Sequence, residues 1–170
     1  TPSAQGAKTI DVAGGGFTDS SGNNNSAATQ FNWTYDTANP ALSSSTPADN
    51  ATGVGVNANI VLTFSEVVDV ESGNVTIKKT SDNSTIETIA VGSSKVSGTG
   101  TNTITINPAA TLAVGIEYYV LIDTTAFDDP SGNSYPGISS TTALSFTTVA
   151  DSTDPTLSSS SPVNGARNVG

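Results

Sequence analysis

The sequence NIVLTFS, residues 59–65, decides the fold because apolar and polar residues alternate along it without a break. Successive side chains of a β-strand point to opposite faces of the sheet. Ile60, Leu62 and Phe64 are therefore expected to face a core, and the residues between them to face outward. This pattern predicts a strand with one buried face, as in many antiparallel sheets.

Similar short runs continue in both directions along the chain. They are rich in β-branched and aromatic residues and are separated by Gly, Pro, Asn and Ser, which favour turns. The predicted strands of this set are residues 40–54 with a kink at Pro47, 59–65, 73–80, 85–91, 101–107, 117–123 and 143–149. Seven short strands without helical periodicity predict an all-β fold, an antiparallel Greek-key sandwich of two sheets.

The sequence LAVGIEY, residues 112–118, adds a sharper signal where the chain enters the penultimate strand. A Leu, a Gly and a Tyr at this spacing resemble the tyrosine corner, in which the Tyr hydroxyl bonds to nearby backbone and fixes a Greek-key crossover. We interpret Tyr118 in this way; the alternative is an ordinary strand aromatic.

One stretch of the sequence occurs twice. Residues 36–55 read DTANPALSSSTPADNATGVG and residues 151–170 read DSTDPTLSSSSPVNGARNVG, and they align without a gap at a distance of 115 positions. A period of this length indicates tandem modules. We therefore expect residues 1–36 to be the C-terminal hairpin of a preceding module, 37–150 a complete module, and 151–170 the linker and first strand of a following module. The shared pattern of FTDSSGN at 17–23 and FDDPSGN at 127–133 supports this division.

Composition narrows the functional classes. The net charge of −10 argues against nucleic acid as a partner. His, Cys and Met are all absent, so there is no imidazole base, no thiol nucleophile and no zinc-binding set. No run is long and apolar enough to span a membrane, so direct membrane insertion is not expected. We expect a protein that is not an enzyme.

Several of these motifs together resemble the bacterial Ig-like domains of large surface and secreted proteins. They are PADNATGV at 47–54, NIVLTFSE at 59–66, the Leu112, Gly115 and Tyr118 set, DPSGN at 129–133 and SFT at 145–147. The chain departs from the family at Gly55 and Val67, where members often carry Pro. The resemblance implies an Ig-like sandwich that serves as a spacer or adhesive module, usually in tandem.

Acidic residues are expected to gather at one pole of such a sandwich. The B–C region, the F–G loop and the entering linker share that pole. Calcium prefers six to eight oxygen ligands from carboxylates, amides and carbonyls, and similar adhesin modules often hold calcium at their junctions. The candidate calcium ligands are Asp36, Glu66, Asp69, Asp128, Asp129 and Asn133. The alternative is an acidic pole that is simply solvated.

The functional expectation is a structural or spacer module of a bacterial extracellular or cell-surface repeat protein, such as an adhesin, a surface layer or a fibre. Its partners would be neighbouring modules, or other copies joined head to tail by strand exchange, with a surface glycan or protein bound through the wider array. One alternative is a recognition module, for which Tyr135 is the evident loop aromatic. Another is an accessory domain of a secreted hydrolase.

Overall fold

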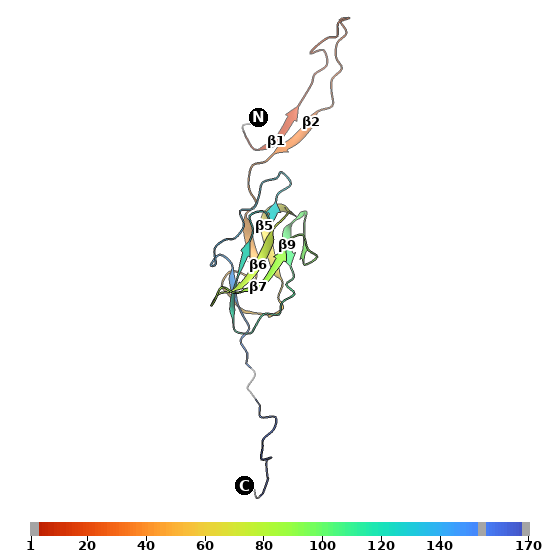
Figure 1. The fold of residues 1–170 in the computed structure, drawn as a ribbon. Coiled ribbons are helices and arrows are strands. Elements are labelled where there is room, and N and C mark those ends of the chain that lie inside the picture. Colours follow the sequence, from red (N-terminus) through yellow and green to blue (C-terminus); the bar gives the residue numbers. More distant parts are fainter. Residues whose placement is uncertain (1–3, 153–155, 168–170) are drawn as a thin grey trace.

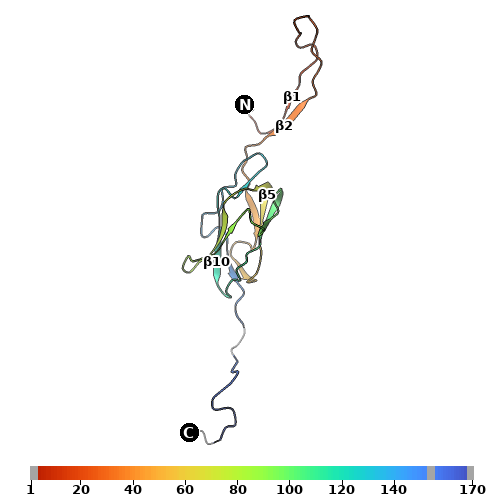
Figure 2. The ribbon, with the colours of Figure 1, turned by 45° about the vertical axis from the view of Figure 1, so that its right-hand side comes forward.

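The computed structural model describes residues 4–152 and 156–167. This part of the chain contains twelve strands, and no helix in it is long and apolar enough to cross a membrane. Strands β3 to β12 form a two-layer β-sandwich, while β1 and β2 form a separate hairpin at one end (Figure 1). The chain after β12 leaves from the opposite end of the sandwich (Figures 1 and 2).

One layer of the sandwich is a five-stranded sheet in the order β4-β12-β10-β6-β7. Its strands are β4 (Ala51–Val54), β12 (Ser145–Thr148), β10 (Glu117–Ile122), β6 (Asn74–Lys79) and β7 (Thr85–Ala90). Neighbouring strands are antiparallel, except that β4 runs parallel to β12. The fold is therefore not a simple meander, because β4, near the start of the sandwich, lies beside β12, its last strand.

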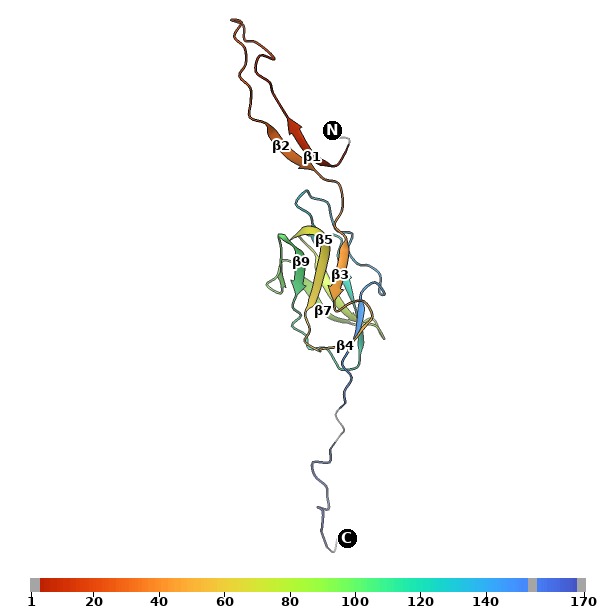
Figure 3. The same cartoon turned by 180° about the vertical axis from the view of Figure 1, so that it is seen from behind.

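The second layer is built around β5 (Ile60–Val70), the longest strand. β5 pairs with β3 on one side and β9 on the other, and with β11 near its end. The strands that complete this layer are β3 (Leu42–Thr46), β8 (Val96–Ser97), β9 (Thr101–Ile106) and β11 (Phe127–Asp128). Figure 3 shows β3, β5 and β9 across the front of the molecule.

The predicted first strand, residues 40–54, is divided into β3 and β4, which belong to different layers. β3 pairs with β5, and after the buried Pro47 the chain continues as β4 beside β12. Pro lacks a backbone N–H and interrupts a ladder, so the predicted kink at Pro47 is confirmed.

Alternation along β5 places its apolar residues in the core. Ile60, Leu62 and Phe64 are at most 2% exposed, as predicted. The Phe64 ring contacts Phe127 at 5.4 Å and Tyr135 at 5.1 Å between ring centroids. Tyr135 is only 5% exposed, so the prediction of an exposed loop aromatic at this position is wrong. Its ring fills the sandwich end next to Phe64.

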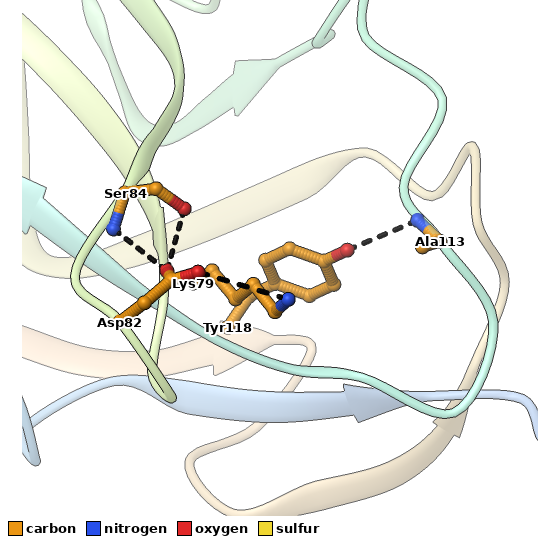
Figure 4. A network of polar contacts seen from close by, with 5 residues as sticks. All are labelled: Lys79, Asp82, Ser84, Ala113 and Tyr118. Atoms are coloured by element: carbon orange, nitrogen blue, oxygen red, sulfur yellow. Dashed lines mark hydrogen bonds and ion pairs between the residues drawn. The ribbon is translucent and has the colours of Figure 1, made fainter.

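The tyrosine corner is also confirmed. The backbone N–H of Ala113 donates a 3.0 Å hydrogen bond to the hydroxyl of Tyr118, which reaches across the bend before β10 (Figure 4). Thr148 braces the same bend, because its hydroxyl donates to the carbonyl of Ala113 at 2.7 Å. Together with the sheet order, this establishes the predicted all-β, Ig-like sandwich.

Two features of the sandwich differ from the expectation. The short strands β8 and β11 were not predicted, since neither contains more than two residues. β5 runs to Val70 instead of ending near residue 65, with a register shift between Thr63 and Val68. Glu66 and Asp69 were expected in a B–C loop, but both lie on this strand.

The hairpin consists of β1 (Gly6–Ile10) and β2 (Phe31–Tyr35). The loop at its tip makes the same hydrogen bonds as a loop of the sandwich that lies 110 residues later in the sequence. The Asp19 carboxylate accepts hydrogen bonds from the backbone of Ser21 and Asn23 at 2.8 and 2.9 Å, and Asn23 Nδ2 donates to it at 2.9 Å. Asp129 accepts the same three bonds from its own second and fourth neighbours, at 2.8, 2.8 and 2.9 Å. This short sequence pattern therefore folds the same way in both places.

The C-terminal segment likewise repeats the conformation around Pro47. Ser45 Oγ donates to the Pro47 carbonyl at 2.7 Å, and Ser160 Oγ donates to the Pro162 carbonyl at 2.9 Å. The turn that precedes β4 closes with a 3.0 Å bond from Ala51 N–H to the Ala48 carbonyl. The bond from Ala166 N–H to the Val163 carbonyl has the same length. The local conformation around Pro162 therefore repeats that around Pro47, although the described residues of this segment form no strand.

Candidate metal centre

Three carboxylates meet where the hairpin joins the sandwich. One oxygen from each of Asp36, Glu66 and Asp129 lies within 4.8 Å of the others. Asp36 directly follows β2, Glu66 lies on β5 and Asp129 directly follows β11. Three segments far apart in the sequence thus supply one group of negatively charged oxygens, which we call the acidic cluster.

Asp129 is the fixed member of the acidic cluster, with only 4% of its surface exposed. Burial raises the pKa of its carboxyl, but hydrogen bonds from the Asn133 side chain and from the backbone of Asn133, Ser131 and Gly132 outweigh it. The pKa therefore lies below the ordinary value. Hydrogen bonds to a carboxylate favour its charged form, so Asp129 is held as an anion by its own loop.

The pKa of Glu66 is shifted in the opposite direction to that of Asp129. Its carboxyl is half-buried, and desolvation together with the charges of Asp129 and Asp36 raises its pKa. No comparable set of hydrogen bonds offsets these effects. The negative charge of Glu66 is therefore less stable in the fold than that of Asp129.

Asp36 connects the cluster to the hairpin. Its Oδ1 atom accepts a hydrogen bond from the side-chain amide of Gln5 at 2.5 Å and one from the backbone of Ala38 at 3.0 Å. Gln5 precedes β1, so this contact joins the base of the hairpin to the linker. The contact between Gln5 and Asp36 was not predicted from the sequence. It depends on the pairing of Gly6 with Tyr35, which brings the residues just before β1 and just after β2 together.

No lysine or arginine neutralises the acidic cluster in the part of the chain that the structure describes. The ion pairs found there join Lys79 to Asp82 and Lys95 to Glu87, and neither includes a cluster residue. Like charges at this separation repel, and the repulsion grows as water is excluded. A bound cation is one way to relieve it.

Asp69 and Asp128, two of the other predicted ligands, lie outside the acidic cluster, and the third, Asn133, supports it. Asp69 and Asp128 are direct partners across the β5–β11 ladder, and Asp69 also accepts a 3.3 Å hydrogen bond from the hydroxyl of Thr99. Asn133 is close, but its amide donates to Asp129 and so supports that carboxylate from behind. Glu66 lies within the register shift between Thr63 and Val68, whereas Asp69 lies beyond it, opposite Asp128.

The chemistry of the acidic cluster fits calcium. Carboxylate oxygens are the ligands that Ca²⁺ prefers, and a fixed anion combined with two less constrained ones suits its flexible coordination. Asp36, Glu66 and Asp129 would supply three of its ligands, and water or backbone carbonyls would complete the six to eight that it takes.

The fold and this cluster define a small Ig-like module with an acidic pole. The chain belongs to the family of bacterial Ig-like domains, whose model matches residues 36–148. Among solved structures, the S-layer protein rSbsC is similar at 20% identity with a TM-score of 0.42. That match covers 66% of this chain and 14% of the S-layer chain, so this chain spans only a small part of that protein's length. Comparison with curated proteins finds no match.

Proposed function

We propose that this chain is a structural spacer of a bacterial extracellular or cell-surface repeat protein, in which Ig-like modules are strung end to end. The observation that carries the proposal is the placement of the ends. The chain enters the sandwich at the hairpin pole and leaves at the opposite pole (Figure 1). Successive modules connected in this way extend a chain rather than fold back on it.

The internal repeats support a tandem arrangement. We assign the hairpin to the last two strands of a preceding module, because its tip carries the same hydrogen bonds as the loop after β11. We assign residues 151–170 to the linker and first strand of a following module, since the described part repeats the bonds around Pro47. Such an array would serve an adhesin, a surface layer or a fibre, and other copies could extend it head to tail.

Calcium at the acidic cluster would give such a spacer a rigid joint. Without a cation, three carboxylates repel one another at the point where Asp36 links the hairpin to the sandwich. With Ca²⁺ bound, the linker, β5 and the loop after β11 would share one ion. Ligand that binds only the folded state adds about 2.7 kcal/mol of stability at a hundredfold excess over Kd.

Thermal unfolding with calcium and with EDTA tests the joint. We expect calcium to raise the midpoint of the parent chain and of Asp69→Asn, whose site on β5 lies outside the cluster. Glu66→Gln should lose this response. In EDTA it should unfold at a higher temperature than the parent, because the raised pKa of Glu66 means that its negative charge opposes folding at neutral pH.

Two outcomes would count against calcium: equal midpoints with and without the ion in the parent, or a full response in Glu66→Gln. The acidic cluster would then be a solvated pole. The spacer itself has a separate test in small-angle scattering, which should give an elongated particle for the 170-residue chain. A compact particle, with the hairpin folded against the sandwich, would contradict an end-to-end array.

The recognition alternative has lost the aromatic residue on which it depended. Tyr135 lies in the core against Phe64 and cannot contact a glycan or a protein partner. The alternative of an accessory domain in a secreted hydrolase has no specific support in the described residues. The spacer is therefore the function that the geometry supports best.

A further inference from the structure

Glu87 is a carboxylate that points into the sandwich from an edge strand. β7 ends one layer and β8 ends the other, so no further strand of the described residues lies on this side of the sandwich. Glu87 is opposite Ile77 on β6, two positions before the buried Ile89, which is opposite Val75. Strand alternation therefore places Glu87 on the same face of β7 as Ile89, toward the core. Its side chain is only 10% exposed.

The Glu87 carboxylate holds the start of the connection from β9 to β10. Its Oε2 atom accepts hydrogen bonds from the backbone N–H groups of Ala109 and Ala110, both at 2.9 Å. Its Oε1 atom accepts a hydrogen bond from Lys95 Nζ, in the connection from β7 to β8. The Asn107 N–H donates to the Lys95 carbonyl at 2.8 Å, so the two connections are also joined through their backbones. Glu87 thus ties three segments together.

The far end of the same connection is fixed without Glu87. The Leu112 N–H donates to the Val56 carbonyl and the Ala113 N–H donates to the Tyr118 hydroxyl, both at 3.0 Å. These acceptors are uncharged at neutral and acidic pH. By contrast, the start of the connection is bonded to a group whose charge depends on pH.

Glu87 is held as an anion at neutral pH. Burial raises the pKa of its carboxyl, but the hydrogen bonds from Lys95 and from the backbone of Ala110 and Ala109, together with the charge of Lys95, outweigh burial. The pKa therefore lies below the ordinary value. Lys95 is the charged side chain that faces Glu87 among the described residues. β6 contributes the apolar Ile77, and residues 107–111 contain no charged side chain.

We propose that Glu87 is an acid-sensitive latch, which holds residues 107–111 against the side of the sandwich between β7 and β8 and releases them when it is protonated. Protonation removes the ion pair and weakens both backbone bonds, because hydrogen bonds to an ionised group are about twice as strong as neutral ones. The latch is closed above the unfolded-state pKa of about 4.3 and opens as the pH falls through the lower folded-state value.

The inference goes beyond the proposed spacer and does not depend on calcium, because the acidic cluster contains none of these residues. Residue-specific hydrogen exchange of the 170-residue chain in EDTA tests it, with each rate corrected for the pH dependence of intrinsic exchange. The protection of the Ala109 and Ala110 amides should fall about tenfold between about pH 6 and pH 3. Val120 donates to the Leu144 carbonyl at 2.9 Å and should keep its protection, because the sheets stay folded.

Two variants assign the change to the latch. Glu87→Gln has no charge to lose, so the protection of Ala109 and Ala110 should be low throughout this pH range. The Asn133 amide, which donates to Asp129 in another loop, should keep its own pH dependence in this variant and serves as the matched control. Lys95→Gln removes the charge that lowers the Glu87 pKa, so protection should be lost at a higher pH than in the parent.

Protection of Ala109 and Ala110 that does not change with pH in the parent would overturn the inference. The same pH dependence in Glu87→Gln as in the parent would overturn it as well. An equal loss at Val120 would also do so, since the sandwich would then be unfolding as a whole. A loss in Lys95→Gln at the parent's pH or below it would show that the ion pair does not control the latch, and would likewise overturn the inference.

Discussion

The hairpin and the sandwich contain the same short patterns but place them in different surroundings. The loop at Asp19 and the loop at Asp129 make the same three hydrogen bonds, yet Phe17 is 63% exposed and Phe127 is not exposed at all. Loop shape follows from a few neighbouring residues, since Asp and Asn side chains bond to backbone groups two to four positions away. Burial depends on partner strands that are distant in sequence, and among the described residues the sandwich has such strands while the hairpin does not.

The strongest test of this difference in burial is to remove an aromatic ring from each region. Phe64→Ala should destabilise the sandwich by about 3–5 kcal/mol, because a completely buried ring leaves a cavity between Phe127 and Tyr135. Phe31→Ala removes a ring of the same size from an exposed position and should change stability by no more than about 0.5 kcal/mol. Urea unfolding followed by circular dichroism measures both. A small loss for Phe64→Ala would mean that the register of β5 is wrong.

The two aspartate loops offer a comparison of intermediate size. Asp129→Ala removes the acceptor of three hydrogen bonds in a buried loop and should cost about 1–3 kcal/mol. Relief of the repulsion with Glu66 favours the lower end of that range. Asp19→Ala alters the same bonds on a fully exposed loop and should leave the unfolding midpoint of the sandwich unchanged.

The cost of Asp129→Ala should also depend on pH. The folded-state pKa of Asp129 is depressed, so its contribution is present above the unfolded-state value of about 3.9 and is lost as the pH falls through the folded value. Unfolding curves of parent and variant in EDTA should therefore approach one another as the pH falls below about 4. Curves that stay equally far apart at low pH would show that the loop does not depend on the charge of Asp129.

The sequence alone predicted those features of the fold that depend on a local pattern or on the order of the strands. Alternation predicted the buried face of β5, and the spacing of Leu112, Gly115 and Tyr118 predicted that the Tyr118 hydroxyl bonds to nearby backbone, which in the structure is the N–H of Ala113. The gathering of Asp36, Glu66 and Asp129 followed from which segments share a pole of the fold. These inferences needed only strand periodicity and the order of strands in a sandwich.

The rest of the site depends on details that a pattern does not encode. β5 continues past residue 65 with a register shift between Thr63 and Val68, and of its two acidic residues Glu66 and Asp69 only Glu66 joins the cluster. Tyr135 lies in a segment rich in turn-forming residues, but backbone bonding to Phe127 directs its ring into the core. Gln5 contacts Asp36 across 31 positions, a separation set by the length of the hairpin.

The smallest expected effect concerns the tyrosine corner, which the sandwich has and the hairpin lacks. Lys8 takes the place of Tyr118 in the hairpin, opposite Trp33 instead of Phe146. Tyr118→Phe would leave the ring packed against Phe146 but remove the acceptor of the Ala113 N–H. Water can reach the exposed Ala113, so the loss should be about 0.5–1 kcal/mol.

The neighbouring tyrosine is a matched control for this last substitution. Tyr119 is also 2% exposed, but its hydroxyl donates to the side chain of Asn83, which is exposed and free to turn toward water. Tyr118→Phe leaves a backbone donor with a fixed direction, whereas Tyr119→Phe leaves a side chain that can reorient. We therefore expect the smaller loss for Tyr119→Phe in urea unfolding. An unchanged stability for Tyr118→Phe would mean that Thr148, which braces the same bend, holds it without help from the Tyr118 hydroxyl.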